Sequence, residues 1–481
     1  MRDNSFDVKQ RLKVDFDKVI CERFLGLNGV YHGFAYMKEY EARGGCDADV
    51  EREIAYAKKA NLKIARTFFG LHWFSNSIDG PYDMESERMQ AFCKWLELTK
   101  NSGIDVALEC GGFTGSTFFG HEKIDPERDP QKFAEGYYQV LKYLILEKGF
   151  TNIKYLSLFV EPTTNERRAI PDGFPDVWSY YVVVVKAIHE RLIRGGIRDK
   201  VKLVGPNNSE RGRHIANAVA DLSDEIDIFS GHFYNYVQHW EWKLMCNDFA
   251  RIVAPTGKPF WMDEYGIQME LLRNTPQYGT MIANIVSASV SAGHQTTLIW
   301  TLFDQLHLTG GKEFTKGDTS HTYNMDSFHD GVHRWGLRRW IRDNIPEAGE
   351  AYPAWYAYCL LANALGGENV STCFTDDGSE DYFTTAKSNT TDYVCATKSG
   401  DDITVVAVNS NAFPSEIILD TNGGDRTIYR YSFEPWSDDK FYCTQNEPIK
   451  MEMKDGKLED TLPKGGFCVY STRCDIPRDY E

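Results

Sequence analysis

The chain has 481 residues, of which 42% are hydrophobic and 26% are charged, so it can build a large apolar core. That composition excludes a disordered or fibrous protein. The formal net charge is −17, from 53 basic and 70 acidic residues. Such a charge repels phosphate backbones and anionic lipid surfaces, and basic residues occur only in short runs such as Gly336–Trp340. Nucleic acid and membrane partners are therefore disfavoured.

The N-terminal segment and the cysteines bear on location and cofactors. Met1–Asp7 lacks an apolar signal core, and no stretch reaches the roughly 20 apolar residues of a membrane-spanning helix. The 11 cysteines include no Cys-x-x-Cys pair, which leaves a zinc ribbon or a redox motif unsupported. We expect reduced thiols, no cofactor and a cytoplasmic protein, or a secreted one if a signal peptide has been removed.

In chain order, short apolar runs alternate with amphipathic helical runs up to about residue 365. The helical runs include Asp49–Asn61, Glu85–Asn101 and Tyr352–Leu365. The apolar runs are rich in Val, Ile, Leu and Phe, as parallel strands covered by helices must be. Eight strands are predicted: Phe24–Tyr31, Leu62–Phe69, Ile104–Cys110, Ile153–Glu161, Val201–Pro206, Ile226–His232, Pro259–Glu264 and Thr296–Leu302. This alternation predicts an α/β fold, a (β/α)8 TIM barrel over residues 21–365.

The rhythm changes after Gly366, where long helical periodicity disappears. Short alternating segments such as Asp402–Val408 and Ser415–Leu419 are separated by turn residues, which predicts a small all-β domain, a β-sandwich, over residues 366–481. Val8–Phe16 also alternates, so residues 1–20 are predicted to supply a strand that pairs with this domain. Leu306–Pro346 lacks periodicity, and a loop of that length is usually functional.

Two glutamates end predicted barrel strands. Glu161 ends the fourth and Glu264 ends the seventh, and catalytic groups of such barrels lie at the carboxyl ends of strands. A charge there is costly unless it is paired or functional, although either residue alone could be an exposed loop carboxylate. The two strands face each other across the ring. Retaining glycoside hydrolysis needs two carboxylates about 5 to 5.5 Å apart, one as acid/base and one as nucleophile.

These strand ends resemble the glycoside hydrolases of clan A, with the likeness covering Phe24–Leu365. That clan carries an acid/base glutamate after strand four and a nucleophilic glutamate after strand seven, so the resemblance implies these roles for Glu161 and Glu264. It also implies a preference for β-linked sugars. Further matches are Arg66 as the arginine that holds the nucleophile, His232 and Tyr234 as the strand-six pair, and Trp300 as the floor of the sugar site.

The roles of these groups can also be stated physically. Glu264 must be ionised to attack, and a cation such as Arg66 with a donor such as Tyr234 would depress its pKa. Glu161 must hold a proton, which an enclosed setting near a second carboxylate favours. Alternatively, Arg66 bridges barrel layers and His232 is a hydrogen-bonded core histidine.

One position departs from the clan pattern. Val160 stands where most of the clan has an asparagine that contacts the sugar 2-hydroxyl. Asn165–Glu166 offers another such pairing, but Glu161 is preferred because it ends the apolar run and Pro162 follows it. Val160 also leaves open a carbohydrate-binding barrel that has lost catalysis.

Aromatic residues after strand ends are predicted to stack on sugar rings. His72 and Trp73 follow strand two, and Trp240 follows strand six. Asn207 after strand five is expected to bind a hydroxyl group, although asparagine is also common in turns. A metal-dependent barrel hydrolase would need a His-x-His pair near strand one, where only His32 occurs. The sequence therefore predicts a retaining glycosidase whose partner is a carbohydrate substrate.

Overall fold

The structure of the chain is a computed structural model. It describes residues 9–31, 44–71, 74–75, 80–110, 129–162, 173–208, 213–234, 240–267, 270–306, 332–342, 346–377, 392–443 and 447–478. Within these ranges, no helix combines the length and the apolar character needed to cross a lipid bilayer.

Eight parallel strands form a closed barrel, which confirms the predicted fold class. Each strand pairs with the next along the chain, and β9 pairs with β2 to close the ring. Apolar side chains such as Ile64, Val204 and Trp261 fill the interior. In chain order the strands are β2 (Leu27–Val30), β3 (Ile64–Phe69), β4 (Asp105–Cys110), β5 (Ile153–Ser157), β6 (Lys202–Asn208), β7 (Ile228–Tyr234), β8 (Phe260–Gly266) and β9 (Thr296–Ile299).

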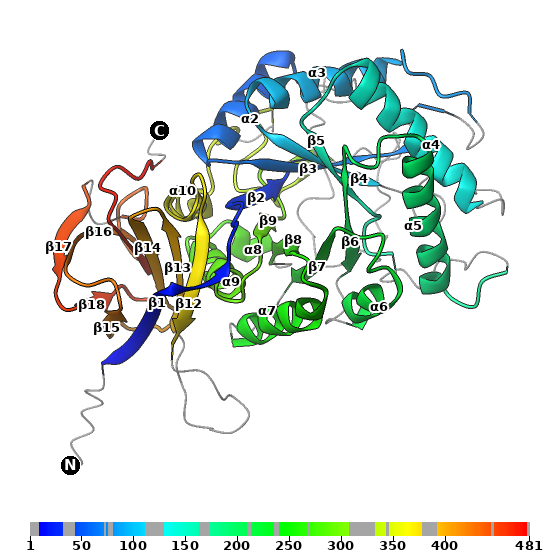
Figure 1. The fold of residues 1–481 in the computed structure, drawn as a ribbon. Coiled ribbons are helices and arrows are strands. Elements are labelled where there is room, and N and C mark those ends of the chain that lie inside the picture. The colour runs from blue at the N-terminus through cyan, green and yellow to red at the C-terminus, as the bar shows by residue number, and fades with distance from the viewer. Residues whose placement is uncertain are drawn as a thin grey trace.

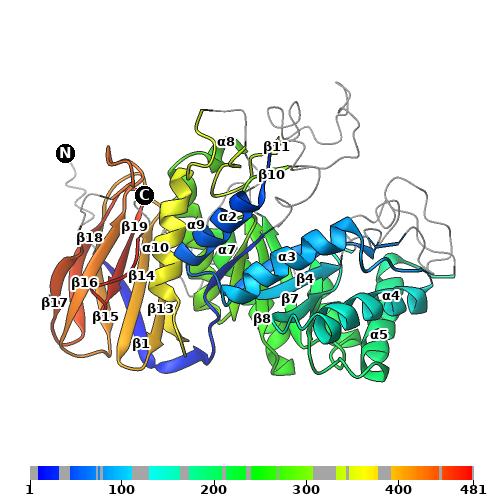
Figure 2. The ribbon, with the colours of Figure 1, turned by 90° about the horizontal axis from the view of Figure 1, so that it is seen from above.

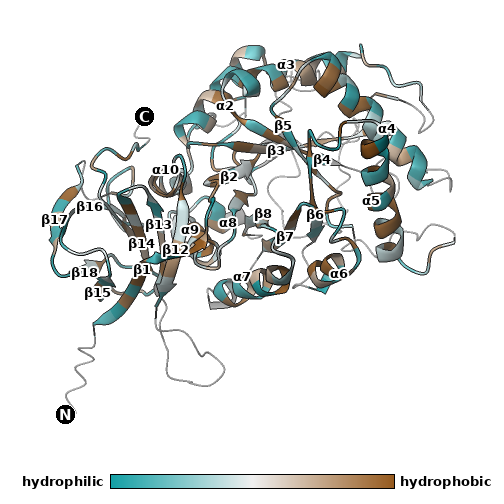
Figure 3. Cartoon of the chain, in the orientation of Figure 1, coloured by the Kyte–Doolittle hydropathy of each residue, from teal (hydrophilic) through white to brown (hydrophobic). Residues whose placement is uncertain are grey.

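Helices surround this ring (Figure 1). Side-chain caps fix several of their starts, because the first backbone N–H groups of a helix have no partner within it. Ser86 and Asp176 accept such bonds, and Asp129 does so directly before Pro130. Helices α5 and α7 carry hydrophobic and hydrophilic stretches side by side, as helices with one buried face do (Figure 3). The helices are α2 (Asp47–Lys59), α3 (Glu87–Asn101), α4 (Pro130–Lys142) with the π-helix η2 (Tyr143–Glu147), α5 (Val177–Arg194), α6 (Arg213–Asp221), α7 (Trp240–Val253) with the 3-10 helix η3 (Ala254–Thr256), α8 (Glu270–Arg273), α9 (Gln277–Ser291) and α10 (Pro353–Leu365).

A nine-stranded, mostly antiparallel sheet forms the second unit. The N-terminal strand β1 (Gln10–Cys21) lies inside it, antiparallel to β12 and parallel to β15, as the sequence predicted. Residues from β1, β14 and β18 share one apolar core, so the sheet folds over on itself as a sandwich. Its other strands are β12 (Ser371–Asp376), β13 (Asp392–Ser399), β14 (Asp402–Asn409), β15 (Ser415–Thr421), β16 (Arg426–Phe433), β17 (Ile449–Met453), β18 (Lys457–Leu462) and β19 (Phe467–Ser471).

The two units share a continuous apolar interface. On β14, Ile403 and Val405 face the core of the sandwich, whereas Val406 and Val408 belong to the same cluster as the barrel helices. Helices α9 and α10 lie between the ring and the sheet (Figure 2). Both faces of β14 are therefore covered, which explains why its sequence is apolar almost throughout.

The chain after β9 contains a short two-stranded element near the mouth of the barrel. The strand β10 (Gln305–Leu306) pairs antiparallel with β11 (Val332–His333). The predicted loop Leu306–Pro346 spans this element, and its residues 307–331 and 343–345 lie outside the described residues.

Candidate active site

The side chains of Glu161 and Glu264 meet at the mouth of the barrel. Glu264 lies near the end of β8, and Glu161 follows the end of β5. One carboxylate oxygen of each residue lies within 4.8 Å of the other and of a ring nitrogen of His232. The pair that the strand pattern singled out is therefore brought together across the ring.

The surroundings of Glu264 favour its ionised form. Nη1 of Arg66 donates to its Oε1 at 2.6 Å, and the hydroxyl of Tyr234 donates to its Oε2 at 2.6 Å. Its side chain is only 5% exposed. Burial opposes ionisation, but His232 and Arg66 outweigh it, so the pKa of Glu264 lies below its ordinary value. A carboxylate with two donors and little solvent is poised to act as a nucleophile.

Arg66 joins Glu264 to a third carboxylate, Glu109, at the end of β4. Nε and Nη2 of Arg66 lie 2.9 and 2.8 Å from Oε2 of Glu109, and both side chains are fully buried. Burial raises the pKa of Glu109 against the pull of Arg66. Sequence reasoning missed Glu109, although it ends the apolar run Ile104–Cys110 much as Glu161 and Glu264 end theirs. Its partner Arg66 is therefore fixed from two sides.

His232 lies between the carboxylates of Glu161 and Glu264. Its Nδ1 is 2.9 Å from Oε1 of Glu161 and 3.4 Å from Oε2 of Glu264. Its Nε2 faces the carboxylate of Asp263 at 3.6 Å. Burial lowers the pKa of this histidine, but Glu264, Asp263 and Glu161 together raise it to about 9. The three carboxyl groups around the ring therefore favour its protonated form.

Glu161 sits in a tight turn rather than in a strand. The sequence placed the end of the fourth strand at Glu161, but β5 ends at Ser157 because the chain bends there. Phe159 and Glu161 have φ values of 63° and 42°, which side chains other than glycine rarely adopt. Local strain of this kind clusters at functional sites. The turn leaves the Glu161 side chain 22% exposed at the mouth.

Asn207 supports this turn from below. Its carbonyl oxygen accepts the backbone N–H of Glu161 at 2.9 Å, and its Nδ2 donates to Ser157 Oγ at 2.6 Å and to Phe159 O at 3.3 Å. The hydroxyl of Ser230 donates to its Oδ1 at 2.7 Å. Asn207 is fully buried, and its amide is occupied by these internal partners.

Of the tryptophans predicted at the sugar site, only Trp300 has a side chain that the structure describes. The ring of Trp300 lies 6.1 Å from that of Trp335 and 5.9 Å from that of Phe68, directly after β9. All three residues are partly exposed, and Trp300 directly follows β9, which pairs with the Glu264 strand β8. His72, Trp73, His32 and Asn165–Glu166 lie outside the described residues, as does the side chain of Trp240 at the start of α7.

Glu161, His232 and Glu264 also form a group that could in principle hold a metal ion. A metal would have to displace the donors that already occupy Glu264, namely Arg66 and Tyr234. A guanidinium beside a ligand oxygen repels a cation. We therefore do not assign this group as a metal site.

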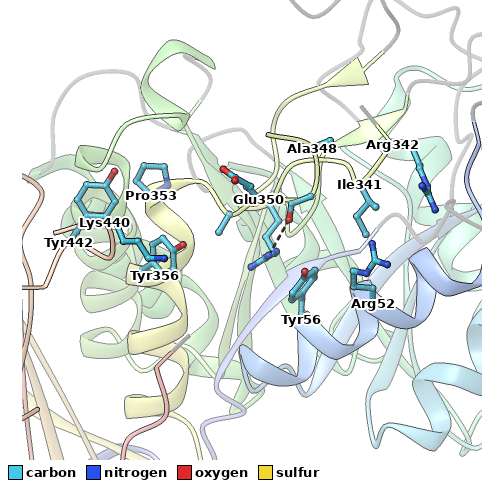
Figure 4. A pocket seen from close by; sticks show the side chains of 13 residues that line it. Arg52, Tyr56, Ile341, Arg342, Ala348, Glu350, Pro353, Tyr356, Lys440 and Tyr442 are labelled. Carbon is cyan, nitrogen blue, oxygen red and sulfur yellow. Dashed lines mark hydrogen bonds between the residues drawn. The ribbon is translucent and has the colours of Figure 1, made fainter. Parts of the chain in front are cut away.

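A separate cavity of about 790 Å³ lies between the barrel and the β-domain (Figure 4). Helix α2 contributes Arg52 and Tyr56, the start of α10 contributes Pro353 and Tyr356, and the β-domain contributes Lys440. None of the residues around Glu161 and Glu264 lines it. It is thus a feature of the interface between the two units.

No family model matches the sequence, and no curated protein matches it. Solved structures do match over almost the whole chain. A GH30 endoxylanase from Clostridium papyrosolvens C71 is 12% identical, with a TM-score of 0.61 over 96% of this chain and 99% of its own. A glucosidase from Croceicoccus marinus is 12% identical, with a TM-score of 0.60 over 97% and 99%. A GH39 β-xylosidase from Caulobacter crescentus is 13% identical, with a TM-score of 0.56 over 96% and 99%. The fold is that of GH30 and GH39 glycoside hydrolases. At these identities the likeness shows the fold alone.

Proposed function

We propose that the protein is a retaining glycoside hydrolase acting on β-linked sugars, with Glu264 as nucleophile and Glu161 as acid/base. The observation that carries this proposal is the approach of the two carboxylates, whose nearest oxygens lie within 4.8 Å. That separation suits double displacement, whereas inverting enzymes need roughly 6.5 to 9.5 Å to seat a water between the carboxyl groups.

The proposed reaction has two steps. Glu264 attacks the anomeric carbon while Glu161 gives its proton to the departing glycosidic oxygen, which leaves a glycosyl ester on Glu264. Glu161 then takes a proton from water, and the resulting nucleophile displaces Glu264 and regenerates the starting state. Arg66 and Tyr234 stabilise the carboxylate that leaves in the second step, because both donate to it.

The substrate class rests on the resemblance and on the fold. The solved structures of similar fold include an endoxylanase, a glucosidase and a β-xylosidase, which supports a glycoside substrate. Trp300, with Trp335 and Phe68 near it, supplies an aromatic surface on which a sugar ring can stack. We assign Asn207 to positioning Glu161 and not to sugar binding, because its side chain is fully buried.

A sugar-binding barrel without catalysis is the first rival, because Val160 replaces the asparagine of the clan. Arg66 and Tyr234 both donate to the buried carboxylate of Glu264, which favours catalysis, because a site that only binds sugar has no need of a desolvated nucleophile. A metal-dependent hydrolase is the second rival, which the Glu161, His232 and Glu264 group brings into view. Activity that survives extended dialysis against a chelator argues against it.

The test is a kinetic comparison on a panel of aryl β-glycosides. Glu264→Ala and Glu161→Ala should each lower kcat by about 10⁴-fold or more while the melting temperature stays near that of the wild type. Added azide should restore Glu264→Ala and give a glycosyl azide of inverted configuration, and it should restore Glu161→Ala with retained configuration. Near-normal hydrolysis by both folded variants contradicts the proposal.

A further inference from the structure

Two buried polar atoms behind the catalytic pair face each other without a completed hydrogen bond. Nε2 of His232 and Oδ1 of Asp263 are 3.6 Å apart, and neither has a hydrogen-bond partner among the described residues. Both side chains are at most 1% exposed. A buried donor and a buried acceptor are each costly when left unsatisfied, so a small closing shift that joins them is favourable.

The other ring nitrogen completes a chain of contacts. Nδ1 of His232 is 2.9 Å from Oε1 of Glu161, so Asp263, His232 and Glu161 are linked in series. Asp263 directly precedes Glu264 on β8. Its carboxylate faces Nε2 of the imidazole, whereas Glu161 faces Nδ1. The order is carboxylate, imidazole, carboxylate, in which the central ring can carry a proton on either side.

We propose that Asp263 is a positioning residue for the acid/base step. By accepting from Nε2–H of His232 it turns Nδ1 towards Glu161, so that His232 and Glu161 share the one proton that the departing oxygen takes up. This role rests on the proposed function, because it presupposes that Glu161 is the acid. In the shared state the proton lies either on Glu161, facing the lone pair of Nδ1, or on Nδ1, facing the Glu161 carboxylate. When this proton passes to the leaving group, neither Glu161 nor Nδ1 of His232 retains it. Water supplies a new proton in the second step.

The surrounding charges favour keeping this proton. Facing His232 are Glu161 from the turn after β5, and Asp263 and Glu264 from β8. Arg66, the cation bound to Glu264, is also paired with Glu109. Three acidic groups therefore surround one imidazole, and the pKa of His232 is raised accordingly. Removing the Asp263 charge should release the shared proton at lower pH.

The first experiment does not depend on activity. Nitrogen-15 labelled histidine side chains of the full chain are followed by NMR from pH 5 to 10, with His232 identified by its loss in His232→Gln. The wild type should keep Nε2 protonated throughout and titrate above pH 8, and Asp263→Asn should titrate about one unit or more lower. A wild-type ring that carries its neutral-state proton on Nδ1, or a His232–Glu161 pair that has already lost the shared proton at pH 7, overturns the proposal even if no Asp263 variant folds.

The second experiment separates the acid step from the nucleophile. A phenyl glycoside needs the acid, whereas a 2,4-dinitrophenyl glycoside does not, because its leaving group departs unprotonated. Asp263→Asn should lower kcat/KM for the phenyl substrate about tenfold or more, move its alkaline limb about one unit lower, and change the dinitrophenyl value less than about threefold. Tyr234→Phe is the matched control, because Tyr234 contacts Glu264 and should leave the alkaline limb in place.

Two results distinguish the possible failures. Equal losses on both substrates with an unmoved alkaline limb would make Asp263 merely structural and overturn its assigned role. A wild-type protein that hydrolyses no glycoside, yet shows the expected His232 titration, would refute the proposed function and leave the Asp263–His232 pairing standing.

Discussion

The backbone carbonyl of Asn207 accepts a hydrogen bond from the backbone N–H of Glu161 at 2.9 Å, which ties the end of β6 to the turn after β5. Both residues have positive φ values, 55° for Asn207 and 42° for Glu161. A residue near the end of β6 and a residue in the turn after β5, both with left-handed backbone, thus hold each other in place. This backbone contact and the side-chain hydrogen bonds of Asn207 to Ser157 and Phe159 fix the position of Glu161, the proposed acid/base group.

Asn207→Ala should therefore reduce both stability and catalysis. The change removes the donor to Ser157 and Phe159 and leaves Ser230 without its acceptor, which should cost about 1–3 kcal/mol of unfolding free energy. Activity on a phenyl glycoside should fall more than activity on a dinitrophenyl glycoside. Asn152→Ala is the control, because Asn152 is also buried and donates to Thr99 and Ile104 far from the site. An equal loss of activity in both variants would contradict a positioning role for Asn207.

Tyr234→Phe should shift the acidic limb of the pH profile upward. Glu264 must be ionised, so activity is present above its pKa and is lost as the pH falls through it. The pKa of Glu264 is depressed below the ordinary value of 4.5, and the Tyr234 hydroxyl is one cause. Removing this donor should raise the acidic limb of kcat/KM by about 0.5 to 1 unit. A limb that stays where it was would show that Tyr234 does not tune the nucleophile.

Substitutions at Arg66 and Glu109 should affect stability and activity differently. Arg66→Met leaves Glu109 and Glu264 buried without their cation, which should cost about 3–5 kcal/mol in chemical denaturation. Adding Glu109→Gln removes one of the stranded charges and should recover a large part of that loss. Hydrolysis should not recover, because Glu264 still lacks Arg66. Recovery of activity in the double variant would mean that Arg66 matters only for folding.

The substitution Gly279→Ala tests how tightly the barrel and the β-domain pack. It lies on α9, and a Cβ atom there would come within 2.7 Å of Ala357 on α10 and of Phe433 on β16. Gly→Ala usually stabilises a helix by up to about 1 kcal/mol, but overpacking here should instead cost about 1–3 kcal/mol. Calorimetry should show a lower melting temperature for Gly279→Ala with kinetic constants close to those of the wild type. An unchanged or raised melting temperature would show that the interface can expand.

Much of the architecture followed from local patterns. Apolar runs such as Ile226–His232 alternate with helical stripes, and parallel strands buried on both faces must be apolar throughout, so the eight strands were predictable. Glu161 and Glu264 could be singled out because a charge at the end of such a run is costly unless it is used. The end of β5 was placed too late, since the bend at Phe159 depends on Asn207 from the next strand.

The sequence by itself determined the barrel, the β-domain with its N-terminal strand, and two strand-end glutamates, because periodicity and burial cost act over a few neighbouring residues. Only the tertiary structure decided that Arg66 bridges Glu264 and Glu109, that Asp263 faces His232, and that the amide of Asn207 bonds Ser157 and Phe159 under the turn. These contacts join residues from different strands. Closure of the ring sets their distances, and no local pattern records which side chains will meet across it.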